Sequence, residues 1–293
     1  MSDAGLYENP LVPNKKLLQM YSLMADARAL DEHIAGLRKR VKAGRRLGST
    51  RGEEACRVST AVELLPGDLV SDSQPGVVMD LIAGAQSKTQ IDSLLGRVTE
   101  FREGKIDGTK LAWEGALARV LPWVDNAGDR LRIAMGAALA FKTLKRGSVV
   151  VAYVGNAELD KKEWREIIEA AANLELPMIF VVLPGSGREK RSVAQLSAKV
   201  RSWGMPGIPV DANDAVALYR VTQESLGRIR GGGGPVLIEC KGYRAEGEGA
   251  RQDAAQDPLL QMRGFLLGRK VCTKAWLERA GERLRNRISS TQH

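Results

Sequence analysis

Two uninterrupted apolar runs, separated by one helix-length segment, constrain the fold of this chain most strongly. The runs are residues 149–154 (VVVAYV) and residues 178–183 (MIFVVL), and neither alternates with polar residues. Strands that are buried on both faces of a sheet have this pattern. Residues 161–174 between them are expected to form a helix. A strand, a helix and a strand in this order form a βαβ unit, which predicts a parallel sheet with a right-handed crossover.

Weaker periodic segments surround this unit. We expect further strands at residues 69–70, 208–210 and 236–240 and helices at residues 15–41, 53–65, 77–85, 89–95, 133–144, 213–230, 259–267 and 275–288. Asn14 and Thr273 are candidate N-caps of the first and last helices. Residues 101–128 have no clear period, and residues 246–256 are expected to form a loop. The predicted fold class is α/β, with a mostly parallel sheet and helices on both faces.

The domain prediction is one domain over residues 1–293, with a helical arm at about 1–50 and a helix pair at about 258–290. No apolar run is long enough to span a bilayer, and the first residues lack the basic-then-apolar pattern of a secretory signal. The three cysteines, Cys56, Cys240 and Cys272, lie far apart in the sequence and form no CxxC pair. This odd, scattered set favours a reducing compartment. We therefore expect a cytoplasmic protein without a membrane partner.

The net charge is +9 and the calculated pI is about 9.6, so an acidic partner is a possible binding class. The densest basic cluster comprises Arg38, Lys39, Arg40, Lys42, Arg45 and Arg46. We interpret this cluster as cations at the C-terminal end of a long helix, where they suit the helix dipole. Nucleic-acid binding is not expected, because no aromatic side chains interleave with these cations as a base-stacking platform requires.

Several motifs, in a shared order, carry a resemblance to a known family. They include LLQMYSLMADARALDEHIAGL, Gly52-Glu53-Glu54-Ala55, LLPGDLVSD, AMGAALAFK, LELPMIFVV, GGGGPVLIECKGYR and the segment that begins at QDPLLQM. Together they resemble the α subunits of the thiamine-diphosphate-dependent 2-oxo acid dehydrogenases, which act on pyruvate or branched 2-oxo acids. The resemblance covers nearly the whole chain and implies the thiamine-diphosphate-binding fold.

The resemblance also indicates where a cofactor site would lie. Ligands of such sheets bind at the carboxyl ends of the strands. The loop after the first apolar run is Gly155-Asn156-Ala157, where the family has Gly-Asp-Gly, and the loop after the second contains Pro184-Gly185, where the family has an Asn pair. The candidate cofactor-binding residues are therefore Gly155, Asn156, Glu158 and Gly185. None of them is assigned a catalytic or metal-binding role.

The residue types at these positions do not suit magnesium diphosphate. Mg²⁺ prefers hard oxygen ligands that include a carboxylate, whereas Asn156 is neutral and Gly185 has no side chain. Glu158 and Asp160 follow this loop directly. We interpret them as acidic residues at a helix N-terminus, which the helix dipole favours. The alternative is that one of them supplies the missing carboxylate ligand.

Other positions that the resemblance assigns to the site are changed as well. The family's Tyr-Arg pair falls on Gln74-Pro75, and its two histidines fall on Gly48 and Glu248. The two histidines that the chain does have, His33 and His293, do not lie at the family's catalytic positions.

Two functional hypotheses follow. The first is a non-catalytic structural or regulatory homologue that has lost thiamine diphosphate and magnesium, because fold alone does not carry function. The alternative is a working α subunit that uses thiamine diphosphate and magnesium for oxidative decarboxylation with a β-chain partner. The resemblance implies a homodimer or an α2β2 assembly with a β-like chain.

Overall fold

A computed structural model describes residues 11–38, 48–74, 77–84, 88–106, 119–185, 193–242 and 257–290. Five strands form one sheet: β1 (Leu69–Ser71), β2 (Val150–Gly155), β3 (Met178–Leu183), β4 (Gly207–Asp211) and β5 (Val236–Lys241). The helices of the described residues are α1 (Asn14–Arg38), α2 (Glu54–Ala61), α3 (Val77–Ala83), α4 (Lys88–Arg102), α6 (Ala127–Thr143), α7 (Lys161–Asn173), α8 (Leu196–Ser202), α9 (Ala215–Arg230), α10 (Pro258–Gly268) and α11 (Lys274–Ser290), with a short 3-10 turn, η2 (Asn156–Glu158).

The sheet is parallel throughout, in the order β1-β2-β3-β5-β4. This confirms the predicted α/β class and the βαβ unit formed by β2, α7 and β3. The central strands β2 and β3 are in register from Val150 with Met178 to Gly155 with Leu183. Their carboxyl ends therefore lie side by side, as the prediction of a ligand edge requires.

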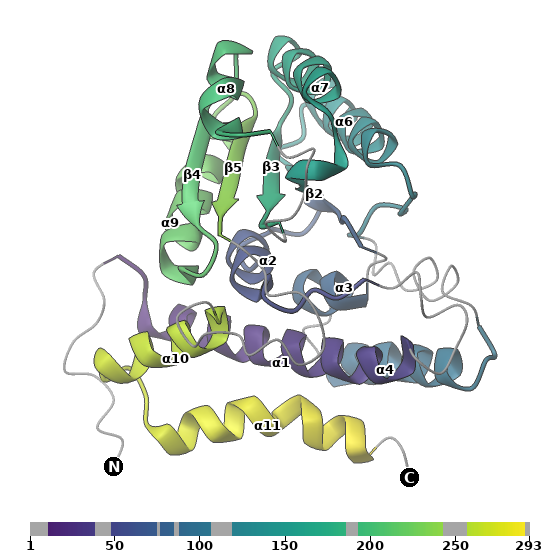
Figure 1. Ribbon diagram of the computed structural model, residues 1–293, viewed down its shortest axis with the longest axis vertical. Helices are drawn as coiled ribbons and strands as arrows, with labels where there is room; N and C mark the ends of the chain where they lie inside the picture. Colours follow the sequence, from purple (N-terminus) through teal and green to yellow (C-terminus); the bar gives the residue numbers. More distant parts are fainter. Residues whose placement is uncertain are drawn as a thin grey trace.

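Two apolar cores cover the two faces of the sheet. Alternate residues of β2 and β3, such as Val151 and Val181, pack into the core shared with α2 and α9, while Ala152 and Phe180 pack against α6, α7 and α8. Figure 1 shows α1, α10 and α11 as a further helical layer beyond α2. Arg283 and Arg285 of α11 form ion pairs with Asp26 and Glu32 of α1, so the first and last helices are held together.

Several predicted bounds were wrong. α2 ends at Ala61 rather than at residue 65, and α4 extends to Arg102 because its buried side chains continue to Phe101. α6 begins at Ala127, six residues earlier than predicted, because the Asn126 side chain accepts the Asp129 N–H and caps the helix. The short α8 was not predicted.

Other predictions agree with the structure or concern residues that it does not describe. Thr273 caps α11 by accepting the Trp276 N–H at 3.3 Å, as predicted, whereas Asn14 is the first residue of α1 rather than a residue that precedes it. The loop at 246–256 and most of the basic cluster at 38–46 fall outside the described residues. None of the described helices is both long enough and apolar enough to cross a bilayer.

Candidate functional site

The predicted site residues meet at the carboxyl edge of β2 and β3. Gly155 ends β2, and η2, which follows at once, contains Asn156 and Glu158. Gly155 pairs with Leu183, the last residue of β3, so Gly185 leaves the sheet from the neighbouring strand two residues later. The four residues therefore lie at one edge of the sheet, as the parallel strands predicted.

The Asn156 side chain is tied to the backbone of Val193. Its amide nitrogen donates to the Val193 carbonyl at 3.0 Å, and its Oδ1 accepts the Val193 N–H at 2.7 Å. The residue is 8% exposed, and its own carbonyl accepts the indole N–H of Trp164 at 3.0 Å. The amide oxygen and the amide nitrogen of Asn156 are therefore both hydrogen-bonded within the chain.

The Glu158 carboxylate is also engaged within the chain. Oε1 accepts the Gly155 N–H at 2.7 Å, and Oε2 pairs with Arg130. Arg130 is 3% exposed and donates to the carbonyls of Val124 and Asp125, both at 3.0 Å. The expectation that Glu158 is only a charge near a helix N-terminus was therefore incomplete, because it closes a turn onto the end of β2.

Gly155 leaves the room that this contact needs. A β-carbon on Gly155 would lie 3.1 Å from Oε1 of Glu158. Asp160, by contrast, lies at the N-terminus of α7, as predicted. It caps α7 by accepting the N–H groups of Lys162 and Glu163, at 2.8 and 2.9 Å, and Glu163 accepts the Asp160 N–H in return.

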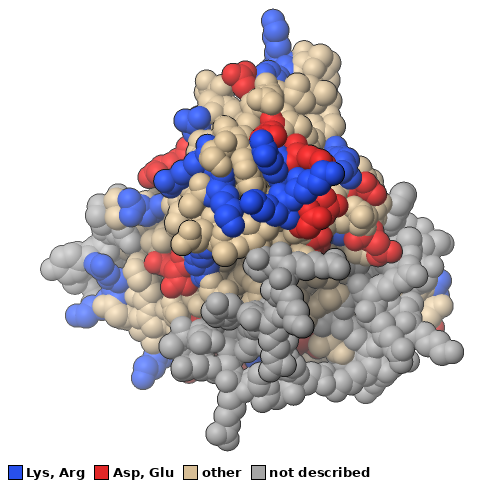
Figure 2. Space-filling view, turned by 45° about the horizontal axis from the view of Figure 1, so that its top comes forward, with Lys and Arg blue, Asp and Glu red and all other residues tan. Residues whose placement is uncertain are grey.

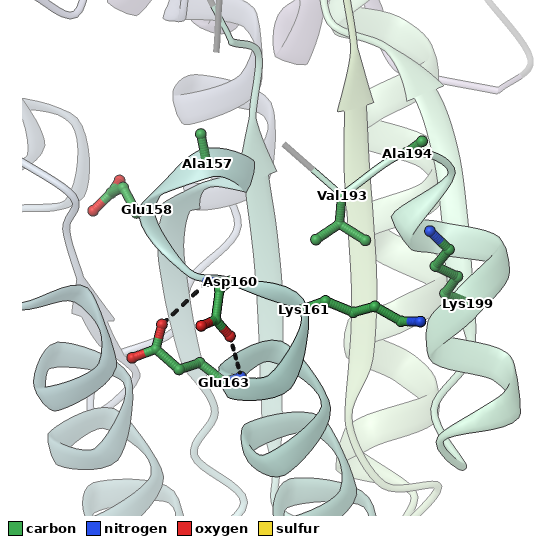
Figure 3. Close-up of a pocket in the computed structure, with 8 residues that line it drawn as sticks. All are labelled: Ala157, Glu158, Asp160, Lys161, Glu163, Val193, Ala194 and Lys199. Atoms are coloured by element: carbon green, nitrogen blue, oxygen red, sulfur yellow. Dashed lines mark hydrogen bonds between the residues drawn. The ribbon is translucent and has the colours of Figure 1, made fainter. Parts of the chain in front are cut away.

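A cavity of about 550 Å³ lies beside this loop, between the start of α7 and the start of α8. Figure 3 shows its lining residues, with the lysine side chains of Lys161 and Lys199 extending from the two helices into the region between them. The lining also carries three carboxylates, Glu158, Asp160 and Glu163, of which only Glu158 pairs with a cation outside the cavity, Arg130. The described lining therefore has no excess of positive charge.

Two further positions that the resemblance assigns to the site lie against each other. A β-carbon on Gly48 would lie 1.8 Å from Oε1 of Gln74. The Gln74 side chain thus occupies the space that a side chain at position 48 would need. Pro75, Glu248 and His293 lie outside the described residues. His33 lies in α1, and burial lowers its pKa.

A buried ionic cluster at the end of β1 was not predicted. Arg57 is fully buried and donates to Glu53 at 2.8 Å and to Asp72 at 2.5 Å. Burial alone would lower the pKa of Arg57, but the carboxylates of Asp72 and Glu53 raise it above its ordinary value. The only sequence signal was the i,i+4 spacing of Glu53 and Arg57, which is usual on exposed helices as well.

A buried carboxyl on α3 has a shifted pKa. Burial raises the pKa of Asp80 to about 7, although Arg97 lies 3.2 Å away and opposes the shift. Among the described residues, no group of three His, Cys, Asp or Glu side chains is arranged to hold a metal ion.

Comparison of the sequence with known proteins shows the family to which the chain belongs. The dehydrogenase E1 component family matches residues 21–289. The chain belongs to this family. It is 26% identical over 292 residues to the chloroplastic pyruvate dehydrogenase E1 component subunit alpha-3 of Arabidopsis thaliana, with 92% of this chain and 68% of the relative covered.

Two bacterial relatives are similar to this chain to about the same degree. The chain is 27% identical over 239 residues to the alpha subunit of acetoin:2,6-dichlorophenolindophenol oxidoreductase of Bacillus subtilis (strain 168), with 80% of this chain and 71% of the relative covered. It is 28% identical over 243 residues to the 3-methyl-2-oxobutanoate dehydrogenase subunit alpha of Mycobacterium tuberculosis (strain CDC 1551 / Oshkosh), with 80% and 62% covered. All three relatives are alpha subunits, which confirms the resemblance seen in the sequence motifs.

Proposed function

We propose that this chain is a non-catalytic member of the family, a structural or regulatory α-subunit homologue that does not hold thiamine diphosphate and Mg²⁺. The observation that carries the proposal is the pair of hydrogen bonds between the Asn156 side chain and the Val193 backbone. A side-chain oxygen that accepts a buried N–H loses that bond if it turns toward a metal. Leaving such a donor unpaired costs about 1–3 kcal/mol.

The rest of the edge supports the same proposal. Gly185 offers no side-chain ligand, and the carboxylate of Glu158, in the turn that follows β2, bonds Arg130 and the Gly155 N–H. Mg²⁺ needs near-ideal octahedral oxygen ligation. The residues present at this edge do not fit it without breaking contacts that hold the loop.

Calorimetric titration of the purified chain with thiamine diphosphate, with and without Mg²⁺, tests the proposal. The expected result is no saturable heat in either case. Submillimolar binding that depends on Mg²⁺ would contradict it. A site could also be completed by another chain, and the same titration on the assembly isolated from the native source tests for this.

The alternative function is a working α subunit that decarboxylates a 2-oxo acid together with a β chain. The family match over residues 21–289 and the similarity to alpha subunits of dehydrogenases favour it. An assay of 2-oxo acid decarboxylation decides between the two. Activity in the native assembly would establish the alternative, and its absence there would exclude it.

We also propose that the chain acts in an assembly, either as a homodimer or with a β-like chain as α2β2. The outer face of α6 exposes Ile133, Leu139 and Leu144, and nothing lies within 4 Å of a β-carbon built on Gly136. A glycine between exposed apolar residues lets another helix approach closely. Light scattering of wild type and Gly136→Lys tests this proposal: a larger wild-type mass that the variant loses is expected, and an unchanged mass would count against the α6 face.

The positive net charge alone does not define a function. Figure 2 shows basic side chains beside acidic ones over the upper part of the molecule. A mixed surface of this kind does not produce the large single-sign field that steers nucleic acid. An acidic protein partner stays a hypothesis, which salt-dependent retention on an anionic resin would support.

A further inference from the structure

The carboxylate of Glu158 is bound by the kinds of donor that proteins use for small oxyanions. One oxygen, Oε1, accepts the Gly155 N–H at 2.7 Å, and the other, Oε2, pairs with the guanidinium of Arg130. Backbone N–H groups and arginine side chains are also the donors that bind phosphate groups. The donors are thus those of an anion site, and the anion that they hold is a side chain of the same chain.

Arg130 has contacts that hold it in place independently of Glu158. Its Nη1 donates to the carbonyls of Val124 and Asp125, both at 3.0 Å, and its guanidinium lies 6.0 Å from the ring centroid of Trp123. The carboxylate of Glu158 is bound by the other terminal nitrogen, Nη2. The guanidinium should therefore keep its position when this carboxylate is removed, with Nη2 left without a partner.

The carboxylate can be reached from solvent, although its cation cannot. The Glu158 side chain is 33% exposed and lines the cavity of about 550 Å³, whereas the Arg130 side chain is 4% exposed. Figure 3 shows the Glu158 side chain pointing away from Lys161 and Lys199. Removal of the carboxylate would therefore open Nη2 of Arg130 to solvent through the space that the Glu158 side chain fills.

The charges at this position require an anion. A buried guanidinium without a counter-charge is unfavourable, because it has lost its hydration and nothing replaces it. Among the described residues, Glu158 supplies the one carboxylate that forms an ion pair with Arg130. A chain without this carboxylate should therefore recruit an anion from solution.

We propose that Arg130 and the Gly155 N–H form a small oxyanion site, and that the Glu158 carboxylate is a tethered anion that keeps phosphate and sulfate groups out of it. Because the carboxylate belongs to the same turn, its effective concentration at the site is about millimolar or higher, and a dissolved anion competes poorly with it. The inference rests on the proposed function in one respect, that the wild-type chain leaves this edge without a cofactor.

Calorimetry of the full chain with inorganic phosphate, at constant ionic strength, tests the proposal. Wild type should show no saturation, whereas Glu158→Ala should bind phosphate at least about tenfold more tightly, because the competing carboxylate is gone. Phosphate should also raise the midpoint of thermal unfolding of Glu158→Ala and leave that of wild type unchanged. Addition of Arg130→Met to Glu158→Ala should abolish both effects.

Glu163→Ala is the matched control. Glu163 lines the same cavity and closes a turn of the same kind, since it accepts the Asp160 N–H at 3.1 Å. It differs from Glu158 in that no cation of the described residues forms an ion pair with it. Glu163→Ala should therefore leave phosphate binding at the wild-type level.

Glu158→Gln gives a second test, because its amide oxygen can still accept the Gly155 N–H while the charge opposite Arg130 is gone. It should gain phosphate binding, though less than Glu158→Ala, since the amide fills part of the space. This variant decides the question if Glu158→Ala does not fold by circular dichroism.

The proposal would be overturned by saturable phosphate binding to wild type, or by the absence of binding to the folded Glu158 variant. An equal gain in Glu163→Ala would also overturn it, because the cause would then be a general loss of negative charge. So would binding that survives Arg130→Met. These results are separate from the proposed function, which fails if the wild-type chain binds thiamine diphosphate with Mg²⁺.

Discussion

The side-chain amide of Gln74 fills the space in front of Gly48, so that a β-carbon at position 48 would lie 1.8 Å from Oε1 of Gln74. The family resemblance assigns a histidine to position 48 and a tyrosine to position 74. The two altered positions are therefore neighbours, and the small residue at one accommodates the amide at the other.

Gly48→Ala should consequently act through Gln74. The atoms that it would meet are the far end of a flexible side chain, so we expect a loss of stability of no more than about 1 kcal/mol. Gln74→Ala should remove most of that loss, because the space is then open. Urea unfolding of both single variants and the double variant measures the coupling. Additive effects would show that the two side chains do not compete for this space.

Asn156→Ala should destabilise the fold by about 1–3 kcal/mol, because it leaves the buried N–H and carbonyl of Val193 without their partner. Asn156→Asp should cost at least as much, since a carboxylate oxygen would face the Val193 carbonyl. Asn173→Ala, at an exposed position of α7, is the matched control. Equal unfolding free energies for the two alanine variants would contradict the structural role given to Asn156.

Arg57→Met should be among the most damaging single changes. It leaves Glu53 and Asp72 buried without their cation, which typically costs about 3–5 kcal/mol. Arg132→Met removes an exposed arginine that pairs with Asp129 at 3.0 Å, and we expect a loss below about 1 kcal/mol. Chemical denaturation compares the two, and similar losses would mean that the Arg57 cluster contributes no more than a surface ion pair.

Asp80 should make stability fall as pH rises. Its pKa is raised from 3.8 to about 7 by burial, so the folded state binds this proton more tightly than the unfolded chain does. The resulting contribution is complete below about pH 4, is lost as pH rises toward about 7, and amounts to at most about 4 kcal/mol. Asp80→Asn does not titrate and should therefore gain stability relative to wild type between pH 4 and 8.

Urea unfolding across this pH range measures the difference for Asp80→Asn. Asp129→Asn, at an exposed carboxylate, controls for the chemical change itself. A constant difference between wild type and Asp80→Asn at every pH would contradict the predicted titration.

The three free thiols should react unequally. Cys56 and Cys240 are buried, and the contact with Cys240, together with burial, raises the pKa of the Cys56 thiol. Cys272 is partly exposed. We expect Ellman's reagent to modify one thiol in the native protein, three after denaturation, and none in native Cys272→Ser. Rapid modification of Cys56 would indicate that the contact between α2 and β5 opens readily.

The sequence was sufficient where one local pattern decided the structure. The apolar run at residues 178–183 coincides with β3, and the Asp160 cap fixes the start of α7. The order of the sheet was not predictable, because β5 inserts between β3 and β4, so that two strands consecutive in the sequence are not paired with each other. Short helices such as α8, with seven residues, are also too brief for a periodic signal.

The site shows the same division. The positions of Gly155, Asn156, Glu158 and Gly185 at one edge followed from the parallel order of strands. The partners of these side chains did not, because Val193 lies 37 residues from Asn156 and Arg130 lies 28 residues from Glu158. Such long-range pairs depend on tertiary packing, which no local spacing encodes.

The pair of hydrogen bonds between Asn156 and Val193 also ties two distant parts of the chain together. It closes a non-covalent ring around α7 and β3, so hydrogen exchange in this segment should occur through one cooperative opening. Asn156→Asp would break the ring without supplying a side-chain oxygen at position 185. A carboxylate introduced at this edge would therefore lower the stability of the chain before it could complete a set of metal ligands.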